Sequence, residues 1–215
     1  MKKIGIILLT MLVVGLMGCA PVSRDETDEH PEKETLEGDK VEPVKETAKS
    51  TYSVEGYIAE VNSNLELQSE TLINTLQKLH TYTFYSQVEL LDFVSFPESS
   101  ELSITMFSMD RQANEVFYDG KDPAIFGGSL SIIEGVNYGE RFGGQSDEFW
   151  KFYEANGEEI EEEEKRAFAN WFADCWEKAN GKSVPLPAYF SIHDDTESFD
   201  LKKNDWIMDE EKWSY

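Results

Sequence analysis

The aromatic residues of this 215-residue chain all lie beyond residue 51. Its 13 Phe, 9 Tyr and 5 Trp supply the large apolar side chains that a packed core needs, and none of them precedes Tyr52. A segment without such side chains cannot bury enough apolar surface to offset the entropy lost on ordering. The sequence therefore predicts one globular domain over residues 51–215, preceded by residues 1–50, which have no core of their own.

The first residues carry the pattern of a secretory signal. Two lysines at positions 2 and 3 precede an almost uninterrupted apolar run over residues 4–14, and the apolar stretch ends near Ala20. This stretch is shorter than the roughly twenty apolar residues that a helix needs to cross a bilayer. We therefore expect it to direct export of the chain.

Residues 16–19 read Leu-Met-Gly-Cys and resemble the lipobox of bacterial lipoproteins, a resemblance confined to residues 1–20. It implies a signal peptide over residues 1–18, cleavage after Gly18 and a diacylglyceryl thioether on Cys19. Two or three acyl chains hold a protein on a membrane, whereas one does not. The resemblance thus implies anchoring to the cell membrane, on its extracytoplasmic face, through lipid on Cys19. A plain signal peptide cut elsewhere and an uncleaved anchor are the alternatives.

Residues 19–50 have the composition of a disordered linker. They contain three prolines and no aromatic residue, and residues 20–50 carry 10 acidic and 5 basic side chains. Charge repulsion extends such a segment, so we expect an acidic tether that holds the domain away from the membrane.

The remaining residues predict an α+β class: a single domain with a mainly antiparallel sheet packed by helices. Apolar spacing predicts a helix from Val54 to Leu65 and another that begins with Ser69 as its N-cap. Strands are expected over 82–96, where Pro97 ends the run, and over 130–138. A hairpin is expected to join 102–106 to 116–118 across 110–114. A strand over 188–192 is expected to pair with a short one around Phe199 and Leu201.

Two further helices follow Ser146 and are separated by Asn156-Gly157. The second runs to about Ala179 and has an apolar stripe at helical spacing, formed by Phe168, Trp171, Phe172, Cys175, Trp176 and Ala179. Cys175 is then a core residue, because its neighbours Asp174 and Glu177 do not favour a reactive thiolate.

The charge of the chain excludes several partners. The formal net charge is -24, and residues 51–215 alone carry 12 basic and 33 acidic side chains. Such a surface repels phosphate backbones, so nucleic acid is excluded as a partner. It also disfavours docking on anionic lipid heads by charge, and it attracts basic proteins.

The densest group of candidate site residues lies near the C-terminus. Possible ligands or acid–base groups there are His193, Asp194, Asp195, Glu197 and Asp200. Their spacing does not match a calcium-binding EF-hand loop, and a polar hairpin turn is the structural alternative. A second run places six glutamates at positions 158, 159 and 161–164, where a solvated helix face is the expectation.

Other features predict little chemistry. No nucleophile elbow, phosphate-binding loop or dinucleotide fingerprint is present, and His80, His193 and Cys175 lack the spacing of a zinc site. We accordingly assign no metal, cofactor or catalytic residue. Trp206, Trp213 and Tyr215 offer a stacking surface for glycans, although Trp206 can equally close the core.

These observations favour a membrane-anchored, extracytoplasmic, non-enzymatic binding module. Its charge suggests an inhibitor or immunity-type protein that captures a basic secreted or envelope protein. The alternatives are a cell-wall hydrolase that uses the carboxylates of the 158–164 run or of Asp194, Asp195 and Glu197, and a calcium-stabilised structural domain.

Overall fold

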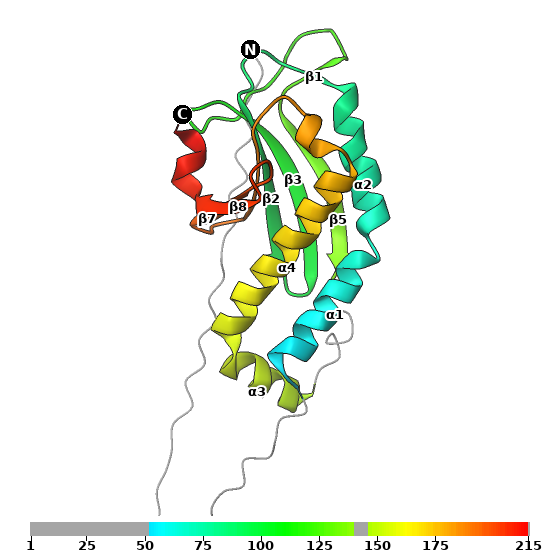
Figure 1. Ribbon diagram of the computed structural model, residues 1–215, viewed down its shortest axis with the longest axis vertical. Helices are drawn as coiled ribbons and strands as arrows, with labels where there is room; N and C mark the ends of the chain where they lie inside the picture. Colours follow the sequence, from blue (N-terminus) through cyan, green and yellow to red (C-terminus); the bar gives the residue numbers. More distant parts are fainter. Residues whose placement is uncertain (1–51, 140–145, 215) are drawn as a thin grey trace, which may run out of the picture. The chain divides into compact units, whose positions relative to one another are not determined.

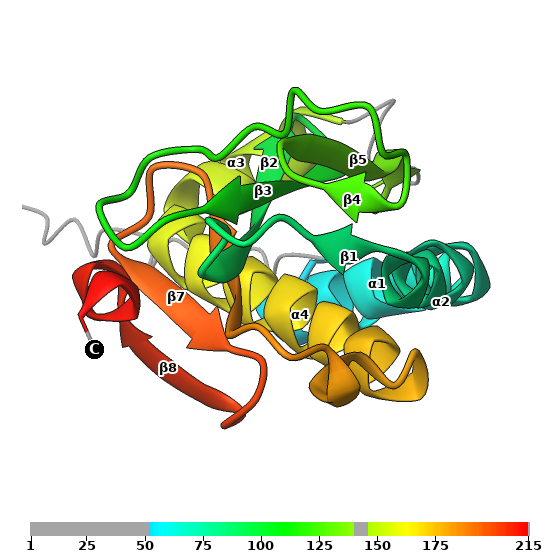
Figure 2. The ribbon, with the colours of Figure 1, turned by 90° about the horizontal axis from the view of Figure 1, so that it is seen from above.

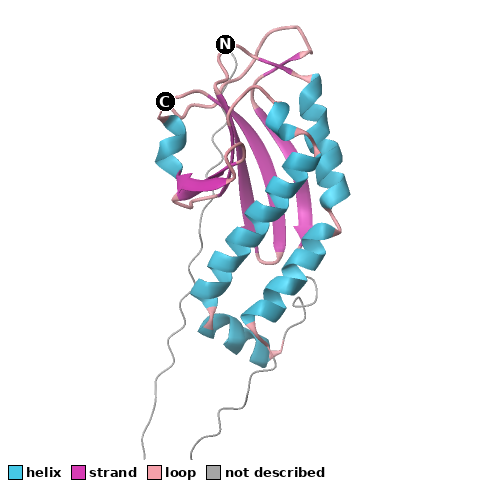
Figure 3. Cartoon of the chain, in the orientation of Figure 1, coloured by secondary structure: helices cyan, strands magenta, loops and turns pink. Residues whose placement is uncertain are grey.

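A computed structural model describes residues 52–139 and 146–214, which belong to one compact unit (Figures 1 and 3). These residues form four α-helices, a six-stranded sheet that is mainly antiparallel and a two-stranded parallel sheet. The predicted α+β class and single domain are therefore confirmed. The predicted signal peptide, Cys19 and the linker lie outside the described residues, as does Tyr215.

The α-helices lie close to the expected positions. They are α1 (Val54–Glu66), α2 (Ser69–Gln77), α3 (Asp147–Ala155) and α4 (Gly157–Lys178), and the short 3-10 turns are η1 (Lys78–Thr81), η3 (Gly181–Ser183) and η4 (Asp209–Trp213). The N-cap predicted at Ser69 is wrong by one residue, because Gln68 precedes the helix. The Ser69 hydroxyl instead donates to Glu66 and accepts from the Trp171 indole. None of the helices in the described ranges is long and apolar enough to cross a membrane.

The strands assemble in the order β5-β3-β2-β6-β7-β8. Their bounds are β2 (Leu90–Glu98), β3 (Glu101–Met109), β5 (Ser129–Asn137), β6 (Ala188–Ile192), β7 (Glu197–Asp200) and β8 (Asp205–Met208), and β1 (Thr83–Phe84) pairs separately with β4 (Ile125–Phe126). Only the β2·β6 pair is parallel within the large sheet. Figure 2 shows the sheet bending so that β7 and β8 lie beside α4.

Two expectations about the strands are wrong. Residues 82–96 form β1 and β2 rather than one strand, and β2 continues past Pro97. The hairpin between 102–106 and 116–118 does not form, since β3 pairs with β2 and β5 on its two sides. Only a single bridge between Met109 and Glu115 remains of it. The expected pairing of β6 with β7 is confirmed.

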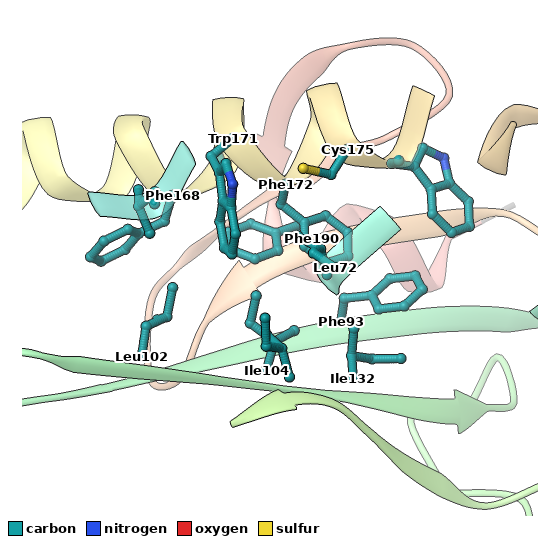
Figure 4. Close-up of a cluster of buried hydrophobic side chains, with 14 of the residues drawn as sticks. Leu72, Phe93, Leu102, Ile104, Ile132, Phe168, Trp171, Phe172, Cys175 and Phe190 are labelled. Atoms are coloured by element: carbon teal, nitrogen blue, oxygen red, sulfur yellow. The ribbon is translucent and has the colours of Figure 1, made fainter. Parts of the chain in front are cut away.

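The core lies between the sheet and the helices (Figure 4). All six residues of the predicted α4 stripe are buried. Phe172 stacks on Phe190 of β6, with ring centroids 4.9 Å apart, and contacts Phe93 of β2 at 5.0 Å. The long helix is therefore fixed across the middle of the sheet, and its N-terminal half extends toward the sheet end where β2 turns into β3 (Figure 1).

Candidate functional site

The described surface contains a groove of about 1210 Å³, which we call the acidic groove. It lies where the β2–β3 turn and the end of β5 meet α1, α3 and the first turns of α4. Its aromatic lining residues are Tyr57, Tyr138, Phe149, Trp150, Tyr153 and Phe168. Its acidic lining residues are Glu158, Glu161, Glu162, Glu164, Asp194 and Asp195. Six carboxyl groups thus line the groove, against the single lysine Lys165.

Glu164 lines the acidic groove and is only 7% exposed. The Tyr57 hydroxyl donates a hydrogen bond to Glu164 Oε1. Burial raises the pKa of the Glu164 carboxyl, the Tyr57 hydrogen bond opposes this, and the charge of Glu161 adds to it. The structure therefore holds a carboxyl group whose ionised form is poorly solvated.

Three phenol groups surround this carboxyl. Burial and the charge of Glu164 raise the pKa of Tyr57, of Tyr138 and of Tyr153, the last to about 12. These tyrosines come from α1, the end of β5 and α3. All three stay neutral at physiological pH, and the groove offers a negative potential beside aromatic faces.

Lys165 joins the β6–β7 turn to α4. Its Nζ lies 2.7 Å from Glu197 Oε2 and 3.0 Å from Asp195 Oδ2, and 5.1 Å from the ring centroid of Trp206. Desolvation works against the charge of Lys165, but hydrogen bonds to Glu197 and Asp195 raise its pKa. The Lys165 ammonium group is therefore fully engaged by Asp195 and Glu197, and it fixes the β6–β7 turn against α4 as one wall of the groove.

The five candidates near the C-terminus therefore do not form one site. Asp195 and Glu197 hold Lys165, while His193 and Asp194 form an exposed pair, 3.1 Å from Nδ1 to Oδ2. The His193 ring also packs on Phe96, with centroids 4.9 Å apart. Asp200 belongs to a different turn from the other four candidates. Its Oδ1 accepts hydrogen bonds from the backbone N–H groups of residues 202 and 203, and its Oδ2 pairs with Lys203. Most of these five residues therefore serve to stabilise polar turns, as the structural alternative predicted.

The glutamate run is largely the solvated helix face that was expected, with one correction. Glu158, Glu159, Glu161 and Glu162 are exposed, but Glu164 is buried. The sequence contained the signal, since Glu164 lies four residues after Ile160 and four before Phe168, on the buried stripe. Treating all six glutamates as one charge run concealed this position.

The remaining candidates have structural roles. Cys175 is fully buried, and desolvation raises the pKa of its thiol, as a core position requires. Trp206 contacts Phe199 edge to face, so it packs against the core. Trp213 lies near the Lys212 ammonium, 4.8 Å from its ring centroid. Within residues 52–139 and 146–214, no three His, Cys, Asp or Glu side chains gather in a way that could hold a metal ion.

A second, smaller cavity of about 500 Å³ lies beside residues 79–88 and 183–186. Its lining contains no acidic residue, and the ring of His80 is occupied by a 3.0 Å hydrogen bond from Nε2 to the Ala179 carbonyl. Of these two hollows, the acidic groove is the better candidate site, because it is larger and is lined by charged side chains. Comparisons with protein-family models, with curated proteins and with solved structures found no match to this chain.

Proposed function

We propose that this chain is a lipid-anchored, extracytoplasmic binding protein that captures a basic protein partner in its acidic groove. The observation that carries the proposal is the composition of the groove, which has six carboxyl groups and one lysine already held by two acids. Opposite charge speeds encounter with a basic partner and excludes acidic competitors. The aromatic lining supplies contact area of the kind that dominates protein interfaces.

The first experiment tests the charge of the groove. Full-length protein in neutral detergent is titrated with a decalysine peptide, and the triple variant Glu158→Gln, Glu161→Gln, Glu162→Gln is compared with the wild type. The matched control is Glu70→Gln, Glu210→Gln, Glu211→Gln, which removes the same charge from exposed positions outside the groove lining. We expect only the groove variant to lose affinity by about tenfold or more at low salt.

Two results would contradict the proposal. Equal losses in both triple variants would mean that the peptide senses net charge alone. Affinity that is the same at about 20 mM and about 500 mM salt would mean that charge does not guide binding, because exposed charges are strongly screened over that range.

Anchoring rests on the Leu-Met-Gly-Cys sequence at residues 16–19 and is tested separately. We expect labelled palmitate to be incorporated into the wild-type chain, and Cys19→Ala to release the protein or to leave an unprocessed precursor. A Cys19→Ala chain of normal size that stays in the membrane fraction would overturn the assignment.

A cell-wall hydrolase remains the second candidate function, and Glu164 favours it. A buried carboxyl with a raised pKa in a groove has the property of a general acid. Asp195 and Glu197 are less suited to this role because both are engaged by Lys165. Release of soluble fragments from purified wall material, lost in Glu164→Gln, would support hydrolysis. If activity were lost only in Asp194→Asn/Asp195→Asn, catalysis would belong to the turn instead.

A further inference from the structure

Three acidic residues are buried in the described part of the chain, and two of them have a cation from the chain itself. Asp92 pairs with Lys212 at 2.8 Å, and Asp200 pairs with Lys203 at 2.9 Å. Glu164 takes part in none of the ion pairs of residues 52–139 and 146–214. Its sequence neighbour Lys165 is directed to Asp195 and Glu197 instead.

A buried carboxylate without a cation is costly for a fold, so its position calls for a functional reason. Here the residue lines an open groove rather than a sealed core. Tyr57, Tyr153 and Phe149 form an aromatic group beside it, with centroid separations of 5.9–6.2 Å. Aromatic faces attract cations, and the attraction is strongest where water is excluded.

We infer that Glu164 and the surrounding tyrosines form a receptor for one alkylammonium group, the side chain of a lysine on the basic partner. This inference rests on the proposed function and names the chemical group that the groove selects. The ammonium group packs beside the aromatic rings and donates a hydrogen bond to Oε2 of Glu164, the oxygen that does not accept the Tyr57 hydrogen bond.

The hydrogen bond from Tyr57 decides between the possible cations. It occupies one of the two acceptor positions on Oε1 of Glu164, so a ligand that uses both carboxylate oxygens must share Oε1 with Tyr57. An arginine fork uses both oxygens of a carboxylate, whereas an ammonium group binds as a point charge to one. A divalent metal ion needs several oxygen ligands, and no group of three candidate ligands exists in the described residues. The geometry therefore favours lysine over arginine and over a metal.

The receptor makes binding depend on pH. The groups that face Glu164 are Tyr57, Tyr138 and Tyr153 from the neighbouring elements and Glu161 from its own helix. The tyrosines stay neutral below about pH 10 and Glu161 only adds negative charge. An ammonium group favours the ionised carboxyl, so affinity rises with pH as Glu164 loses its proton and then levels off.

The experiment uses three peptides with the sequence acetyl-Gly-Xaa-Gly-amide, in which Xaa is lysine, arginine or norleucine. Each is titrated into full-length protein in neutral detergent at physiological salt, with the change in tryptophan fluorescence as the signal, because half-exposed Trp150 lines the groove. We expect the lysine peptide to bind about tenfold or more tightly than the norleucine peptide, the range of one charge-assisted hydrogen bond. Glu164→Gln should abolish that preference, and the exposed Glu161→Gln should retain most of it.

A second variant keeps the test decisive if Glu164→Gln disturbs the fold. Tyr57→Phe leaves the carboxyl in place and removes the donor that shares Oε1, so it should shift preference from the lysine peptide toward the arginine peptide. A lysine preference unchanged by Glu164→Gln, or an arginine preference in the wild type, overturns the receptor while leaving capture of a basic partner intact. Failure of decalysine to bind, by contrast, removes the proposed function itself.

Discussion

Replacing Lys165 with methionine tests whether the wall of the acidic groove is held by one buried cation. The substitution keeps the apolar length of the side chain but removes the ammonium group that contacts Asp195 and Glu197. Lys165 is 10% exposed, whereas its two partners are 21% and 40% exposed. Their partial exposure means that water can replace some, but not all, of the lost interaction.

The loss of unfolding free energy expected for Lys165→Met lies between two limits. An exposed ion pair contributes roughly 0.2–1 kcal/mol, and an uncompensated charge left in the interior costs roughly 3–5 kcal/mol. The intermediate exposure of the carboxylates places Lys165→Met at about 2 kcal/mol of unfolding free energy. For a domain of this size, that loss lowers the melting temperature by about 4–8 °C.

The adjacent residue supplies the control. Arg166 pairs with Glu162 at 2.9 Å, but both side chains are about half exposed. Arg166→Met should therefore cost less than about 1 kcal/mol. Urea unfolding of the full-length variants in neutral detergent measures both values. Equal costs for the two substitutions would refute the reasoning, because they would show that Lys165 acts as an ordinary surface charge.

Three further predictions address other parts of the fold. Lys212→Met leaves Asp92 buried without its cation, and we expect a loss of about 3–5 kcal/mol in urea unfolding; a loss below about 1 kcal/mol would show that the C-terminal turn is not fixed to the sheet by this pair. Gly181→Ala places a methyl group 2.1 Å from the ring of buried Trp176, so it should cost about 1–3 kcal/mol; an unchanged melting temperature would contradict that close approach. The pKa of Glu164 is raised in the folded state, so above pH 4.5, its ordinary pKa, the folded chain binds more protons than the unfolded chain. Stability should therefore fall as pH rises from 4.5 through the raised pKa. Glu164→Gln should flatten that part of the stability–pH curve, and an identical curve for the variant would place the carboxyl in water.

Helices were the more predictable part of this fold. The stripe of α4 repeats over several turns, so burial of Phe172 or Cys175 follows from periodicity alone. Strand positions also follow from alternation, but alternation does not reveal which strand pairs with which. For that reason, the sequence alone could not show that residues 116–118 lie outside the sheet. Pro97 also misled the prediction: β6 pairs with β2 only as far as Ser95, so Pro97 lies in a part of β2 that has a neighbour on one side.

The acidic groove could be predicted only in pieces. Glutamates near residue 160 and the polar turn after β6 were both identified in the sequence as possible sites. That they line one groove depends on the packing of α4 against the sheet, which no local pattern encodes. The tyrosines that surround Glu164 lie 107, 26 and 11 residues before it in the sequence, so their convergence is a property of the fold alone.

The most direct test of the central claim is site-specific crosslinking in the host envelope. A photo-crosslinking amino acid replaces Trp150 at the acidic groove in one variant and Leu67, which is 77% exposed and outside the groove lining, in another. We predict that position 150 yields an adduct with a single basic protein, that high salt abolishes the adduct and that position 67 does not form it. No protein adduct at position 150, or the same adduct from both positions, would contradict capture of a basic partner by the groove.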